Sequence, residues 1–300
     1  MMDLFANGAC ELGEGIFWHP LRKTVFWFDI LGKRLLCKDV NARDGLRQWL
    51  FDEYVSAAGI INQDELLIAS ESGLYLFDLE TKRRKKLVDL EADNPVTRSN
   101  DGRADPFGGF WIGTMGKAAE KSAGSIYRYY EGELRKLFSG LTITNSICFA
   151  PDASYACFAD TTRQVINKVL LDEAGWPILD SVHTFIDLIA EDLNPDGAII
   201  DADGNLWSAQ WGAARVACYD ASGKFLSSVA APSPHISCPA IGGESFDMLF
   251  ATSAQEGLTA KEIEETNAGA VFAMELKKTA MAGIRGQQEN FIKLGGRHEA

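Results

Sequence analysis

The chain has 300 residues, a hydrophobic share of 46% and a formal net charge of −13 at pH 7. A chain of this length and composition can bury a large core, and no apolar run approaches the roughly 18–20 residues that span a bilayer. The acidic surplus argues against nucleic acid and anionic membranes, so we expect neither as a partner. The first residues, MMDLF, lack the basic and apolar segments of a secretory signal.

The six cysteines are spread along the chain without any Cys-x-x-Cys pair, and most lie in apolar, strand-like contexts. In a large chain without a secretory signal, buried free thiols are the expected state of such cysteines. We therefore expect a reducing, cytoplasmic compartment. We also expect a monomer.

In chain order, the sequence repeats one plan six times: a small or polar opening, an apolar strand, a turn, an aromatic strand and another apolar strand. Successive repeats are 41 to 51 residues apart, which fits the four-stranded blade of a propeller. Residues 4–9 are expected to add a strand that closes the ring. The repeats open near Glu14, Ala57, Asn100, Asn145, Asp196 and Ser237. We predict an all-β fold, a six-bladed β-propeller of four-stranded antiparallel blades around a central channel, as one domain over residues 1–300.

The clearest repeat predicts strands over residues 198–200, 206–209, 215–219 and 225–229. Asp203-Gly204 is interpreted as a hairpin turn. It does not begin an EF-hand calcium loop, because position 12 of such a loop would be Gly212 instead of glutamate.

Helical signal is sparse. Residues 187–192 and 259–265 each predict a turn or two of helix, and the second has Thr259 and Glu262 in the spacing of a capping box. Residues 117–123 are expected to form an irregular loop. The tail from Gly283 is polar and predicts no regular element.

Four repeats open with an oxygen-bearing side chain: Glu14, Asn100, Asn145 and Asp196. The innermost strand of a propeller blade lines the channel, so these side chains should meet at one mouth. Burying such an oxygen-rich, anionic cluster is costly without a cation. Oxygen ligands favour one divalent ion such as Ca²⁺, Mg²⁺ or Mn²⁺, whereas Zn²⁺ is less expected without histidine or cysteine.

The segment from Arg98 to Pro106 is the densest polar stretch. The forked guanidinium of Arg98 is suited to hold a substrate oxygen. Asp101 is suited to orient neighbouring ligands. Arg103 and Asp105 are interpreted as an exposed turn pair.

A histidine-based hydrolase has little support. The chain lacks a Gly-x-Ser-x-Gly elbow, and His19 lies in a turn while His298 lies in the tail. We therefore expect no histidine at the channel mouth. The sequence also has no glycine-rich phosphate loop and no dinucleotide fingerprint.

Taken together, these stretches resemble the SMP-30/gluconolactonase/regucalcin-like family over roughly residues 10–275. The matching segments are LGEGIFW (12–18), NDGRADP (100–106), FWIGTM (110–115), TNS (144–146), APD (150–152), PDG (195–197), GNLW (204–207) and WG (211–212). The resemblance implies a six-bladed propeller with one divalent metal, held at positions matching Glu14, Asn145 and Asp196. It also implies substrate contacts at Arg98 and Asn100, and hydrolysis of sugar lactones to aldonic acids.

Two positions depart from the family pattern. Asn145 is followed by Ser146-Ile147 where the family usually has Gly-Leu, a change that should keep the ligand. Some members carry a substrate-contacting glutamate where this chain has Ala118. Lys117 or Glu120 is expected to replace that contact, which bears on sugar preference more than on the reaction.

The hypothesis from the sequence is therefore a metal-dependent lactonase that acts on an aldonolactone such as gluconolactone or a pentonolactone, most simply with Ca²⁺. The metal would polarise the lactone carbonyl, and Asp196 would act as general base. If Asp196 ligates the metal tightly, the metal would activate the water instead. A hydrolase of another ester, or a non-catalytic calcium- or ligand-binding propeller, remains as an alternative.

Overall fold

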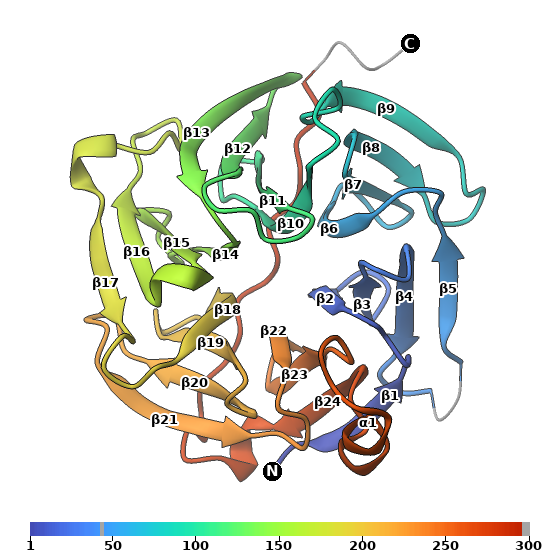
Figure 1. Ribbon diagram of the computed structural model, residues 1–300, viewed down its shortest axis with the longest axis vertical. Helices are drawn as coiled ribbons and strands as arrows, with labels where there is room; N and C mark the ends of the chain where they lie inside the picture. The colour runs from blue at the N-terminus through green and yellow to red at the C-terminus, as the bar shows by residue number, and fades with distance from the viewer. Residues whose placement is uncertain (43–44, 296–300) are drawn as a thin grey trace.

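The structure is a computed structural model that describes residues 1–42 and 45–295. Figure 1 shows six β-sheets arranged as blades around a central axis, and each sheet has four antiparallel strands. The predicted six-bladed propeller is thus confirmed.

Within each blade the first strand lies innermost. Blades 1 to 3 consist of β2 (Gly13–His19), β3 (Thr24–Asp29), β4 (Arg34–Asp39) and β5 (Arg47–Leu50); β6 (Val55–Ile60), β7 (Glu65–Ser70), β8 (Gly73–Asp78) and β9 (Arg84–Asp89); and β10 (Thr97–Ala104), β11 (Phe110–Gly116), β12 (Gly124–Tyr130) and β13 (Glu133–Leu141). Blades 4 and 5 consist of β14 (Thr144–Phe149), β15 (Tyr155–Asp160), β16 (Val165–Leu170) and β17 (His183–Asp187); and β18 (Asn194–Ile200), β19 (Leu206–Trp211), β20 (Arg215–Tyr219) and β21 (Phe225–Ala230).

The two ends of the ring are joined in blade 6. This sheet has β22 (Ile236–Gly242), β23 (Met248–Ser253) and β24 (Ala270–Glu275), and its outer strand is β1 (Asp3–Asn7) from the N-terminus. Asp3 pairs with Ala273, and Asn7 with Ala270. The expected closing strand is therefore confirmed, and backbone hydrogen bonds lock the ring shut.

The hydrophobic core is divided into six layers, one between each pair of neighbouring blades. Aromatic side chains of the second strands anchor several layers, and Trp27, Trp111 and Trp207 are fully buried. The second strands are buried almost along their whole length, and they contain the apolar runs, such as VFWF in β3, FWI in β11 and MLFA in β23. All six cysteines are buried and free, as predicted.

The structure contains little helix. The capping box of Thr259 and Glu262 is confirmed at the start of α1 (Ala260–Thr266), and short 3₁₀ turns occur at η1 (Thr161–Arg163), η2 (Leu179–Ser181) and η3 (Leu276–Lys278). In the described parts of the chain, none of the helices has the length and apolar character needed to cross a membrane.

The helix expected over residues 187–192 is wrong. β17 continues to Asp187, and turns follow. The Asp187 carboxylate accepts a hydrogen bond from the N–H of Ile189, and Leu188 is buried in the layer between blades 4 and 5. Burying Leu188 in this layer is more favourable than forming a short helix, for which residues 187–192 have only a weak preference.

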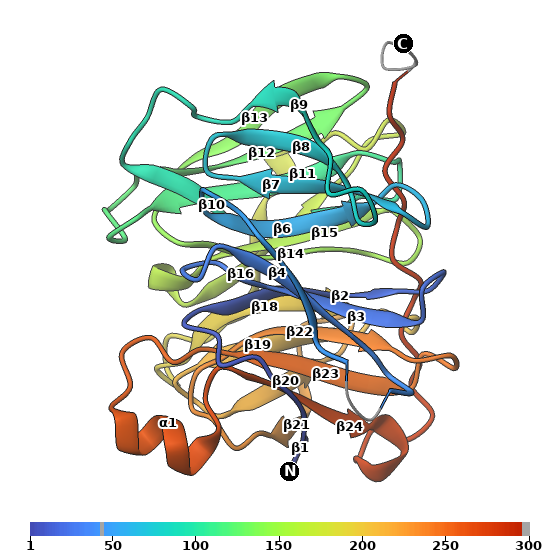
Figure 2. The same cartoon turned by 90° about the vertical axis from the view of Figure 1, so that its right-hand side faces the viewer.

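The tail forms a strap, defined here as residues 283–295, across one face of the ring. In Figures 1 and 2 the strap is the red segment that crosses the channel on the face opposite α1. Its backbone donates to the carbonyls of Phe246, Ile60 and Gly108, which belong to three different blades. These scattered partners explain why the tail shows no periodic pattern.

Candidate active site

Every innermost strand carries a β-bulge close to its start. The register of pairing with the second strand shifts between residues 14 and 17, 55 and 57, 99 and 102, 145 and 148, 195 and 198, and 236 and 239. A bulge redirects side chains and is common beside functional sites. The recurring bulge is thus the physical reason why the oxygen-bearing residues occur at one phase of the repeat.

Two bulges need a left-handed backbone. Gly15 has φ +54°, and a Cβ atom there would lie 2.2 Å from the carbonyl oxygen of Ser56, so only glycine fits. Ser146 takes the same conformation with φ +57°. Its hydroxyl donates to the carbonyl of Asp196 at 2.5 Å, which joins two neighbouring bulges and offsets the backbone strain.

Amide side chains link the site across blades 3 and 4. Asn100 Nδ2 donates to Asn145 Oδ1 at 3.1 Å and to the carbonyl of Thr144 at 2.9 Å. Arg98 Nη1 donates to Asn100 Oδ1 at 2.8 Å. Asn145 Nδ2 donates to Thr161 Oγ1 at 2.8 Å, and the Asn145 oxygen, which accepts from Asn100, has a second lone pair.

All six residues that the sequence predicts for the site line one cavity of about 470 Å³. They come from the openings of blades 1, 3, 4 and 5 and from the loop after β11: Glu14, Arg98, Asn100, Lys117, Asn145 and Asp196. The volume of this cavity suits a small molecule.

The buried acids of the site lie in an unfavourable electrostatic environment. Burial raises the pKa of Glu14 to about 8, and the charge of Asp101 adds to this shift. Burial, and then the charges of Glu14 and Asp101, raise the pKa of Asp196 well above its usual range. Burial lowers the pKa of the Arg98 guanidinium. A cation beside Glu14 and Asp196 would relieve this repulsion.

The donor set fits a hard divalent ion. In residues 1–42 and 45–295 no cluster of three His, Cys, Asp or Glu side chains can hold a metal by itself, so an amide oxygen has to complete the set. Glu14, Asp196 and the Asn145 oxygen supply this combination on the wall of one cavity. Carboxylate and amide oxygens are the ligands that Ca²⁺ and similar ions accept.

Lys117 and Glu120, the two residues expected to replace the glutamate contact that is missing at Ala118, lie in different surroundings. Lys117 lines the cavity. Glu120 instead accepts a hydrogen bond from the backbone N–H of Ala118 at 3.0 Å, within its own exposed loop. Lys117 is therefore the better placed of the two.

The expectation of no histidine at the channel mouth is wrong. His235 lines the cavity and stacks on Trp211, with ring centroids 4.3 Å apart. Its Nδ1 lies 2.9 Å from the carbonyl of Glu256, which fixes the ring. His235 precedes Ser237 by two residues, as Arg98 precedes Asn100. The phase of the repeat was thus the signal that could have identified it. His298 lies outside the described residues.

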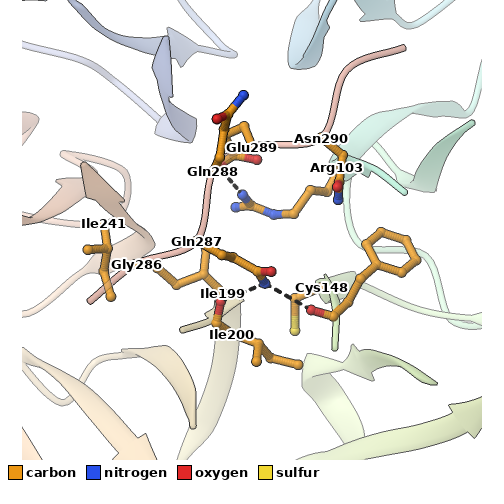
Figure 3. A pocket seen from close by; sticks show the side chains of 11 residues that line it. Arg103, Cys148, Ile199, Ile200, Ile241, Gly286, Gln287, Gln288, Glu289 and Asn290 are labelled. Carbon is orange, nitrogen blue, oxygen red and sulfur yellow. Dashed lines mark hydrogen bonds and ion pairs between the residues drawn. The ribbon is translucent and has the colours of Figure 1, made fainter. Parts of the chain in front are cut away.

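Arg103 and Asp105 do not form an exposed turn pair, so that interpretation is also wrong. Asp105 Oδ2 lies 2.7 Å from Nε of the fully buried Arg128. Arg103 Nη1 lies 2.6 Å from Glu289 of the strap. Figure 3 shows this ion pair, together with Gln287 reaching toward blades 4 and 5. The strap therefore covers the far end of the channel, away from the cavity.

Comparison with known proteins agrees with this architecture. The model of the SMP-30/Gluconolactonase/LRE-like region matches residues 12–255. The chain is 34% identical to an L-arabinolactonase from Azospirillum brasilense over 94% of both chains. It is 31% identical to a 6-deoxy-6-sulfogluconolactonase from Pseudomonas putida over 87% of this chain and 90% of the relative.

Among solved structures, a calcium-binding protein, regucalcin, from Agrobacterium tumefaciens superposes with a TM-score of 0.91 at 34% identity and covers 98% of both chains. The fold, the motifs and these relatives agree along nearly the whole length of the sequence. The chain belongs to the SMP-30/gluconolactonase/LRE-like family.

Proposed function

We propose that this protein is a metal-dependent lactonase that hydrolyses a sugar lactone to its aldonic acid. The observation that carries the proposal is the meeting of Glu14, Asn145 and Asp196 with Arg98 and Asn100 around one cavity. Relatives named as lactonases support the reaction class. The Agrobacterium structure named as calcium-binding supports Ca²⁺ as the ion.

The residues around the cavity have separate roles in the proposed reaction. Glu14, Asn145 and Asp196 would hold the ion, which when bound would act as a Lewis acid toward the lactone carbonyl. Arg98 and Asn100 would hold hydroxyl groups of the sugar and so fix the ester carbon near Asp196.

Asp196 is the proposed general base. Its carboxylate takes a proton from the attacking water as the new C–O bond forms. When the ring C–O bond breaks, the same proton passes to the departing ring oxygen. The aldonic acid then ionises and releases one proton to solution.

His235 brings a second candidate function, the hydrolysis of another ester. A histidine in the cavity could accept a proton through Nε2 when Glu256 holds Nδ1–H. Phenyl acetate and other simple esters therefore belong in the same assay as the lactones.

The experiment is proton release from a panel of aldono-1,4- and 1,5-lactones, with Ca²⁺, Mg²⁺, Mn²⁺ or Zn²⁺ supplied in turn after treatment with a chelator. Metal-dependent acid production above the spontaneous rate would support the proposal. Folded protein that releases acid from no lactone with any ion would refute it and favour a non-catalytic binding propeller.

A further inference from the structure

Lys117 is held in the cavity wall by an ion pair from another blade. Its Nζ lies 2.6 Å from Glu71 Oε2, and the two side chains are 35% and 20% exposed. Nζ also lies 5.8 Å from the ring centroid of Tyr54. The ammonium is therefore confined rather than free to extend into solvent.

Backbone hydrogen bonds fix both ends of this pair. The N–H of Glu71, just after β7, donates to the carbonyl of Tyr54 at 3.0 Å. The N–H of Lys117, just after β11, donates to the carbonyl of Val96 at 2.8 Å. None of the described residues of blade 2 lines the cavity, and Glu71 is the charged side chain that this blade brings to Lys117.

Carboxylates outnumber cations around the cavity. Its described lining residues include two cations, Arg98 and Lys117, and three carboxylates, Glu14, Asp196 and Glu256. Glu14, Glu256 and Asp196 act on Arg98, and Glu71 neutralises Lys117. An ammonium has three donors, and the pair with Glu71 occupies one. Lys117 can thus donate to a hydroxyl group of a substrate while offering little net charge to an anionic group.

We propose that Glu71 is a positioning residue that, by neutralising Lys117 at the cavity wall, sets the preference of the site for uncharged over anionic lactones. The inference rests on the proposed lactonase function and goes beyond it, because it assigns a role to a residue that does not line the cavity. Glu71 acts through Lys117 and does not touch the substrate.

The test compares D-glucono-1,4-lactone with D-glucaro-1,4-lactone, which carries a carboxylate in place of the terminal hydroxymethyl group. Glu71→Gln keeps the shape and an oxygen acceptor for Lys117 but removes the negative charge. The ratio of kcat/KM for the charged lactone to that for the neutral lactone should rise on the order of tenfold, mainly through KM of the charged lactone. A merely structural role would lower both values and leave the ratio unchanged.

Two further variants sharpen the test. Glu80→Gln removes the same charge from the surface beside Arg22, where Glu80 is 62% exposed, and should leave the ratio unchanged. The double variant Glu71→Gln/Lys117→Gln should return the ratio close to that of the wild type. If all variants hydrolyse both lactones with one common ratio, the role of Glu71 is refuted while the lactonase stands. If the wild type hydrolyses neither lactone with any ion, the proposed function itself fails, and this inference with it.

Discussion

Replacing Asp105 by alanine should destabilise the protein strongly, because the substitution leaves the charge of Arg128 buried without a counter-ion. The side chains of both residues are inaccessible to solvent, and Arg128 Nε lies 2.7 Å from Asp105 Oδ2. Asp105 Oδ1 also accepts the N–H groups of Phe107 and Gly109, each at 2.9 Å. The variant would lose three hydrogen bonds, one of which is the ion pair with Arg128, while Arg128 would keep its bond to the carbonyl of Ala174.

Breaking a buried ion pair by removing one partner costs about 3–5 kcal/mol. For a protein of this size, such a loss should lower the melting temperature by roughly 5–8 °C. Asp105→Ala/Arg128→Met removes the stranded charge and should recover part of the loss. Asp52→Ala breaks an exposed ion pair with Arg84, 2.8 Å long, and should cost less than about 1 kcal/mol.

Urea unfolding of the wild type and the three variants measures these free energies. Circular dichroism and tryptophan fluorescence should give coincident transitions, which justifies the two-state analysis. A loss below about 1 kcal/mol in Asp105→Ala would refute the reasoning. The same conclusion would follow if the double variant were no more stable than the single one.

Further predictions concern the site and its surroundings. Asp196→Asn should lower kcat by about 10²–10⁴-fold without lowering the melting temperature, and near-normal acid release from lactones would contradict the general-base role. A proton competes with the cation because burial holds the pKa of Glu14 near 8; calcium affinity measured by calorimetry should therefore rise from pH 6 to pH 8, and a flat profile would contradict this. Burial lowers the pKa of His19 to about 4 in the folded protein, whereas the pKa in the unfolded chain is about 6.5. Between about pH 6.5 and pH 4 the unfolded chain therefore binds one proton more at His19 than the folded protein does. Stability should therefore fall by about 3 kcal/mol as pH drops through this window, and urea unfolding at several pH values should show no such loss in His19→Gln.

The sequence predicts the local structure well because propeller strands pair with their neighbours along the chain. Hydrogen bonds between consecutive strands and the alternation of turns and apolar runs are local properties, and the 41- to 51-residue spacing repeats them six times. The same repetition places Glu14, Asn145 and Asp196 at one phase. Ring symmetry then brings them to one cavity, as the structure shows.

His235 shows the limit of that reasoning. Its phase in the sixth repeat matches that of Arg98, but a histidine there is interpretable only when the loop carrying Glu256 folds over the same mouth. The contact joins the connection between blades 5 and 6 to the loop between β23 and β24, and the relative placement of these two segments has no local signal.

By itself, the sequence determined the propeller, the number of blades and the oxygen-bearing openings, because each depends on a pattern that repeats within about 50 residues. Only the tertiary structure decided the partners of isolated charges. Arg103 pairs with Glu289, 186 residues away, and Lys117 pairs with Glu71 of another blade. Such pairs arise where the closed ring happens to bring single side chains together, and a contact that occurs once leaves no period in the sequence.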